Sequence, residues 1–327
     1  MKVLLHLLGS LLAATLMAWP LQGVAADDAW PQRPIRLVVP FAAGGGNDLL
    51  ARMVADRLSH ELGKPVVVDN RTGAGGAIGT ASVAKATPDG YTMLLGNSAT
   101  HAINLFLYAH LPYDPVKDFV PISQAVNLNF ALVTSTSLPV KDFRDFMELA
   151  KRKPGTLTFA SAGVGTVTQL GVEVLKQMTG ATFDHIPYRG AGPALIDLMG
   201  GQVNFMFIDL STVLPQLKGG KLRALAVGSA QRSPLLPGVP TIAESGVPGF
   251  NVTSWQGFFF PAGTPKDIVT KAQLAIQKVL ATPEVKAELI KAGYDPVGSD
   301  SEHFAAFIHA EIAKWSAAAK SAGVKPE

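Results

Sequence analysis

Short runs of consecutive apolar residues alternate with longer segments of helical periodicity along most of this chain. Runs that are apolar throughout, instead of at every second position, are typical of strands buried on both faces of a parallel sheet. Between them, apolar residues recur every three or four positions, as at Leu50, Val54 and Leu58, which is the period of an amphipathic helix. The alternation predicts an α/β fold with open, mainly parallel sheets. The predicted strands cover 35–39, 66–68, 91–95, 130–133, 157–160, 203–208, 223–227 and 255–260.

One unit of this pattern occurs twice. The strand at 35–39 leads through a glycine loop at 44–46 into a helix, and the strand at 157–160 leads through a loop at 161–166 into another. A glycine-rich turn that opens a helix presents backbone N–H groups and the positive end of the helix dipole, which suit a carboxylate or a phosphate. For one loop alone, a tight turn explains the glycines equally well. Two matched loops, one at the carboxyl edge of each sheet, favour a ligand site between two domains.

The first 26 residues have the pattern of a cleaved export signal. Lys2 precedes an apolar stretch over 3–18, and small residues at 24–26 predict cleavage before Asp27. The stretch is too short for a stable membrane span and no later one is longer, so we expect no membrane insertion. The chain has no cysteine, which excludes disulfides and, with the export signal, favours the bacterial periplasm.

Charge and motif content exclude several classes of function. The 28 basic and 25 acidic residues nearly balance, and the longest basic run, 151–153, reads as a solvated helix end, so no nucleic-acid partner is expected. Gly44 and Gly46 match the first two glycines of a dinucleotide-binding loop, but Leu49 replaces the third. No phosphate-binding loop, nucleophile elbow or metal-binding histidine spacing occurs, so we predict no cofactor, no metal and no catalytic residue.

The mature sequence also carries a series of short motifs. They include Trp30-Pro31-x-Arg33-Pro34-Ile35, Val39-Pro40-Phe41-x-x-Gly44-Gly45-x-x-Asp48, Gly73-Ala74-Gly75-Gly76, Pro88-Asp89-Gly90-Tyr91-Thr92, Pro187-Tyr188-x-Gly190 and Pro261-Ala262-Gly263-Thr264-Pro265. In this order they resemble the Bug family, the extracytoplasmic receptors of tripartite tricarboxylate transporters. The resemblance covers essentially all of the mature chain. It implies a two-domain Venus flytrap binding protein without catalysis, whose ligands are carboxylic acids held by backbone amides and waters.

The resemblance also implies which residues bind the ligand. The loops at 43–48 and 161–166 would supply backbone donors, and polar residues at the end of the strand 91–95 would line the same cleft. Gln169 departs from the family pattern, because many relatives have a histidine there. The predicted ligand-binding residues are Ala43, Gly44, Gly45, Gly46, Asn47, Asp48, Asn97, Ser98, Thr100, Ser161, Ala162, Gly163, Gly165, Thr166, Gln169 and Asp209.

Three of these residues carry more specific expectations. Asp48 is interpreted as a first-turn acid that complements the dipole of its own helix. Asp209 follows a fully apolar strand at the ligand-binding edge, so it is expected to accept a hydrogen bond from an ammonium, hydroxyl or amide group of the ligand. A side chain added at Gly165 is expected to point into an open cleft and to cost little packing energy.

The sequence predicts two domains with discontinuous boundaries, joined by crossing hinge strands. Residues 27–126 and 250–327 would form one domain and residues 127–249 the other. The expected protein is a monomer that binds a small organic acid and docks transiently on inner-membrane transporter subunits. The alternative is an exported hydrolase of small esters or amides, which needs a nucleophile beside a base, and no motif in the sequence indicates such a pair.

Overall fold

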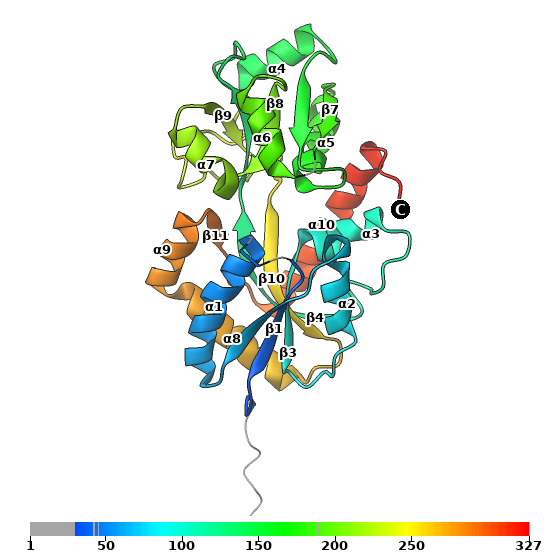
Figure 1. Cartoon of the computed structure of the whole chain (residues 1–327), viewed down its shortest axis with the longest axis vertical. Helices are drawn as coiled ribbons and strands as arrows, with labels where there is room; N and C mark the ends of the chain where they lie inside the picture. The colour runs from blue at the N-terminus through cyan, green and yellow to red at the C-terminus, as the bar shows by residue number, and fades with distance from the viewer. Residues whose placement is uncertain (1–29, 42, 45, 189, 327) are drawn as a thin grey trace, which may run out of the picture.

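The computed structural model describes residues 30–41, 43–44, 46–188 and 190–326. The predicted export signal and Gly45 lie outside these residues. The described chain forms two halves, one above the other in Figure 1, and each half is built around its own mixed sheet.

The first sheet holds six strands in the order β11-β4-β10-β3-β1-β2. β1 is parallel to β2 and β3, and β10 lies antiparallel between β3 and β4. One face of the sheet packs on α1, α8 and α9, and the other on α2 and α10. The strands are β1 (Ile35–Val39), β2 (Val66–Asn70), β3 (Thr92–Asn97), β4 (Phe119–Leu128), β10 (Ser254–Pro261) and β11 (Tyr294–Pro296). The helices are α1 (Gly46–Leu62), α2 (Ala77–Ala84), α8 (Lys266–Ala281), α9 (Pro283–Lys291) and α10 (Ser301–Ser321).

The second sheet holds five strands in the order β7-β6-β8-β5-β9. β6 is parallel to β7 and β8, and β5 is antiparallel to both of its neighbours. Aromatic side chains pack one face on α4 and α5, and aliphatic ones pack the other on α6 and α7. The strands are β5 (Phe130–Ser135), β6 (Thr158–Ser161), β7 (Asp184–Pro187), β8 (Phe205–Asp209) and β9 (Leu222–Val227). The helices are α4 (Phe143–Arg152), α5 (Val167–Thr179), α6 (Ala191–Met199) and α7 (Leu210–Lys218).

The chain crosses between the halves where β4 passes through Asn129 into β5, and again between β9 and β10. The predicted two-domain α/β architecture is confirmed. Each sheet is mixed because a strand beside a crossing, β10 or β5, runs against its neighbours. No helix among the described residues is long and apolar enough to cross a bilayer.

The C-terminal helix α10 joins the two cores. Its first half lies in the core of the first sheet with Phe304, and its second half places Trp315 in the aromatic core of the second. Between them, the buried Glu311 accepts hydrogen bonds on one carboxylate oxygen from the indoles of Trp255, at 3.1 Å, and Trp315, at 2.9 Å. Because Trp255 belongs to β10, this carboxylate fixes α10 to a strand that follows the second crossing.

A short π-helical segment (Ala99–Ile103) and α3 (Asn104–Leu107) follow β3 and bury a histidine. The ring of His101 stacks on Phe259 with 3.9 Å between centroids, and Thr100 Oγ1 lies 2.9 Å from its Nδ1. Among the described residues, Nε2 of this ring has no hydrogen-bond partner. Burial lowers the pKa of His101 from 6.5 to about 3, because removal from water disfavours the charged imidazolium.

The folded protein is therefore expected to lose stability in acid through His101. Between pH 6.5 and about 3 the unfolded chain binds a proton that the folded chain does not, so stability falls by up to about 1.4 kcal/mol for each unit that the pH drops. We predict that His101→Phe, which keeps the ring stacking, gives a shallower dependence of the urea midpoint on pH between 6.5 and 4.5. His110→Phe, at an exposed site, serves as the control and keeps the parental slope. Equal slopes for His101→Phe and the parent would contradict the assignment.

Candidate functional site

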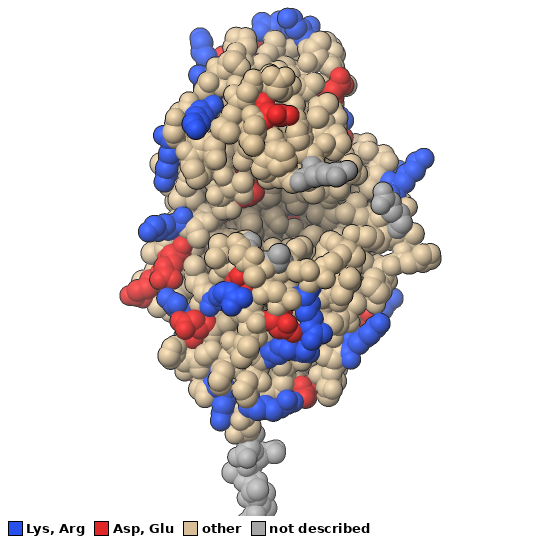
Figure 2. Space-filling model, in the orientation of Figure 1, with Lys and Arg blue, Asp and Glu red and all other residues tan. Residues whose placement is uncertain are grey.

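The two predicted loops both connect the carboxyl end of a strand to the start of a helix. The first runs from β1 to α1 and the second from β6 to α5. In Figure 1 the two halves meet in the region where these helices begin, and Figure 2 shows that the surface is hollowed between the halves. Helix N-termini at the edges of a hollow supply partial positive charge and backbone donors for an anion.

A buried carboxylate holds the first loop in shape. Asp48 is the third residue of α1, and its Oδ2 accepts from the backbone N–H of Gly44, at 2.9 Å, and from Arg52 Nε, at 3.0 Å. Its Oδ1 accepts from the side-chain amide of Asn70 at the end of β2, also at 3.0 Å. The hydrogen bond from Arg52 is the largest cause that lowers the pKa of Asp48, to about 2. Asp48 thus organises the loop and the neighbouring strand, beyond the predicted effect on its helix dipole.

The second loop repeats this arrangement with a neutral side chain. Gln169 is the third residue of α5, and its Oε1 accepts from the backbone N–H of Gly165 at 2.7 Å. Gly44 and Gly165 each stand four residues before the accepting side chain, and both adopt left-handed backbone, with φ of 81° and 74°. Thr168 Oγ1 adds a second bond by accepting from the N–H of Ala162 at 2.8 Å. The two units repeated in the sequence therefore share a hydrogen bond as well, from a loop glycine N–H to the side chain of the third residue of the following helix.

A serine and a histidine meet behind the second loop. Ser161, which is fully buried, has its Oγ 2.7 Å from Nε2 of His185 on β7. The other ring nitrogen, Nδ1, lies 3.3 Å from Nε2 of Gln169, and the ring stacks on Phe159. Burial lowers the pKa of His185, and Lys176 lowers it further. No motif in the sequence indicates this contact between a serine and a histidine, because it depends on the parallel pairing of β6 and β7, which joins residues distant in the chain.

The polar residues at the end of β3 and just after it contact the first loop and the crossing strand. Asn97 donates from its side-chain amide to Asn47 Oδ1 at 3.1 Å, and its own Oδ1 accepts from the N–H of Thr100. The hydroxyls of Ser98 and Ser254 lie 2.5 Å apart, and Ser254 is the first residue of β10. Asn97, Ser98 and Thr100 are all buried, and Asn97 supports the first loop through Asn47; their contact with a ligand stays a prediction.

Asp209 caps a helix at the same junction. Its Oδ1 accepts from the N–H of Thr212, at 2.9 Å, and from the Ser211 hydroxyl, at 2.5 Å, so it is the N-cap of α7. Burial, with the charge of Asp209 as a second cause, raises the pKa of Tyr294 to about 12. Tyr294 in turn donates its hydroxyl proton to the carbonyl of Gly46 at 2.7 Å. The sequence interpretation missed both the cap and this tyrosine; the predicted ligand contact of Asp209 stays a prediction.

The expectation for Gly165 is wrong. A Cβ added at this residue would lie 2.3 Å from Cδ2 of Leu107, at the end of α3, and would not enter open space. Leu107 follows β3 in the first half, so this is a contact between the two halves. The same construction at Gly44 meets nothing within 4 Å.

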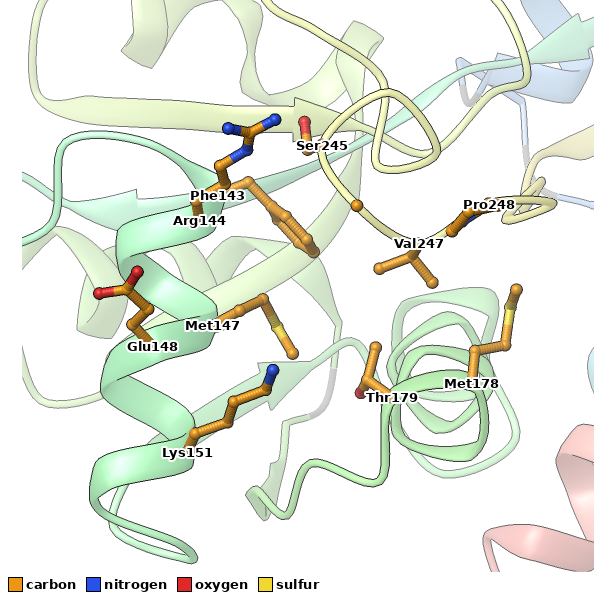
Figure 3. Close-up of a pocket in the computed structure, with 11 residues that line it drawn as sticks. Phe143, Arg144, Met147, Glu148, Lys151, Met178, Thr179, Ser245, Val247 and Pro248 are labelled. Carbon is orange, nitrogen blue, oxygen red and sulfur yellow. The ribbon is translucent and has the colours of Figure 1, made fainter.

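A separate pocket lies on the second half. It has a volume of about 580 Å³ and is enclosed by α4, the end of α5 and the segment 245–248. Figure 3 shows Met147, Lys151 and Met178 among the side chains that line it. Among the described residues, none of the predicted binding residues lines it, so the pocket is distinct from the loop junction.

Comparisons with known proteins agree on one family. The sequence profile described as "Tripartite tricarboxylate transporter family receptor" matches residues 50–324. BugT of Bordetella pertussis is 37% identical over 326 residues, which cover 99% of both chains. Rpa4515 of R. palustris, solved with adipate, superposes with a TM-score of 0.79 at 38% identity and covers 91% of this chain and all of that one. MatC of Rhodopseudomonas palustris, solved with malate, has a TM-score of 0.72 at 34% identity, covering 88% and 99%.

The contact between Gly165 and Leu107 leads to a stability prediction. Gly165→Ala should destabilise the protein by about 2–4 kcal/mol, because it combines a left-handed alanine with an overpacked contact. Gly44→Ala is the matched control: it has a similar φ and open space, so only about 1–2 kcal/mol is expected. In a Leu107→Ala background the extra cost at Gly165 should disappear, as a double-mutant cycle by urea unfolding would measure. Equal costs at both glycines would show that Leu107 does not restrict Gly165.

Proposed function

Because this chain belongs to the tripartite tricarboxylate transporter receptor family, we propose that it captures a small organic acid between its two halves. The observation that carries the proposal is the pair of matched loops at the junction of the halves. Each loop is shaped by the third residue of its own helix, Asp48 or Gln169, and each ends at a helix N-terminus. A carboxylate bound there would meet the positive ends of two helix dipoles and the loop N–H groups that Asp48, Gln169, Thr168 and Ser161 do not already engage.

Two loops favour an acid with two carboxylate groups. Adipate and malate, each present in the structure of a similar protein, are both dicarboxylates. We infer that one carboxylate binds at the first loop and the other at the second, so that the ligand bridges the halves. Such a ligand stabilises the closed arrangement because it contacts both halves at once.

The remaining parts of the proposal concern where the protein works and with what. Export through the signal at 1–26 would place it in the periplasm as a monomer that docks on inner-membrane transporter subunits. The proposed domains are 27–126 with 250–327, and 127–249. The last helix, α10, then contributes to both cores, since Trp315 packs in the aromatic core of the second sheet.

The hydrolase alternative has a specific observation in its favour, the Ser161–His185 pair. Two features weigh against it. Ser161 is fully buried, so a substrate carbonyl cannot approach its hydroxyl. The far side of the imidazole faces the side-chain amide of Gln169, where hydrolases of this type place a carboxylate.

A binding assay tests the proposal. Adipate and malate at 100 times their Kd should stabilise the protein by about 2.7 kcal/mol, which raises Tm by roughly 5–10 °C. Val164→Glu places a negative charge on the exposed tip of the second loop, where Val164 is 60% exposed, and should weaken titrated affinity at least about tenfold. Val116→Glu, at a site that is also exposed and lies outside both loops, is the control and should bind as the parent does.

Two outcomes would contradict this function. One is the absence of any thermal shift with a broad panel of organic acids, including aromatic and amino acids. The other is turnover of p-nitrophenyl acetate that Ser161→Ala abolishes, which would favour the hydrolase.

A further inference from the structure

We propose that His185 is a positioning residue for the second loop, held by Gln169 in the tautomer that carries its proton on Nε2. Four hydrogen bonds link five groups in one continuous series. They run from the backbone N–H of Gly165 through the side chains of Gln169, His185 and Ser161 to the carbonyl of Gly163.

The first hydrogen bond of the series determines which group donates in each of the others. A backbone N–H can only donate, so the group of Gln169 that lies 2.7 Å from Gly165 N is the carbonyl oxygen. The NH₂ of Gln169 must then be the group that lies 3.3 Å from His185 Nδ1. Because that NH₂ can only donate, Nδ1 is the acceptor, and the proton of the neutral ring is on Nε2.

The tautomer decides what the serine does. With its proton on Nε2, His185 donates to Ser161 Oγ over 2.7 Å. The serine hydroxyl proton is then directed to the carbonyl of Gly163, 3.2 Å away, while Oγ also accepts from the Gly163 N–H. His185 therefore acts as a donor that fixes the loop, and it does not serve as a base for Ser161.

In the first loop a side chain accepts from the glycine N–H in the same way, but the hydrogen bonds beyond that side chain differ. There Asp48 accepts from Gly44 and from Asn70, a residue of β2, the strand beside β1. His185 lies on β7, the strand beside β6, so it takes the place of Asn70 in the second loop. A carboxylate accepts on both oxygens, whereas the amide of Gln169 must donate on one side, and only an acceptor such as neutral Nδ1 fits there.

Nitrogen NMR of the imidazole tests the tautomer directly. In the ¹⁵N-labelled protein at pH 7.5 the signals of His185 should show a protonated Nε2 and an unprotonated Nδ1. Gln169→Glu keeps an acceptor for Gly165 but has no donor, so it should move the proton to Nδ1 or leave the ring doubly protonated. A protonated Nδ1 in the parent protein, or an unchanged tautomer in Gln169→Glu, would overturn the proposal.

The positioning role is tested with a neutral variant. His185→Phe keeps a ring beside Phe159 but removes the donor to Ser161, so amide exchange at Gly163 and Gly165 should become about tenfold faster. Adipate, the probe for the affinity arm, should bind about three- to tenfold more weakly, the effect of one ordinary hydrogen bond. His110→Phe is the matched control and should leave both quantities at the parental value.

The measurement of adipate affinity rests on the proposed function. The measurements of the tautomer and of amide exchange do not. If adipate and malate fail to bind the parent protein, the proposed function fails, and the tautomer and the amide exchange still decide the role of His185. If His185→Phe has parental exchange rates and parental affinity, the positioning role is wrong even where the tautomer is as expected.

Discussion

The hydrogen bond from a loop glycine to the side chain four residues later is the contact on which the junction of the two halves depends. Each strand-to-helix turn has a glycine in left-handed conformation, and an unsatisfied N–H at that point would leave the turn free to reorganise. Asp48 satisfies the first glycine and Gln169 the second. The choice of acid or amide then dictates the next partner, Arg52 with Asn70 in one loop and His185 in the other.

The halves are held together by more than their crossing strands. Glu311 brings an indole from β10 and an indole within α10 to one carboxylate oxygen. On the other side of the junction, Leu107 packs on the second loop at Gly165. Tyr294 binds the first loop at Gly46 and lies within the electrostatic influence of Asp209 from the second half. A few side chains therefore link the conformation of the two loops to the relative position of the two halves.

Much of this could be predicted from the sequence, because apolar runs, helical periodicity and paired glycine loops are local signals. The strand at 35–39 is an example, since its apolar run matches β1. The Ser161–His185 pair was not predictable, because it depends on the register of two parallel strands that the sequence does not mark. The contact of Leu107 with Gly165 was missed for a similar reason, since it forms only when two domains meet. The helix cap formed by Asp209 was missed, because a cap and a ligand contact look alike in sequence.

The position of β10 in the first sheet has a consequence for the order in which the chain acquires its structure. The second sheet has all of its strands once residue 227 has been synthesised. The first sheet has β1, β2, β3 and β4 by residue 128 but lacks the strand that separates β3 from β4 until residue 261. A chain that emerges vectorially therefore has all strands of the second sheet before those of the first, while β3 and β4 wait for a partner more than a hundred residues downstream. Pairing between such distant segments is slow and leaves strand edges exposed. The first sheet therefore cannot join β3 to β4 until β10 is present.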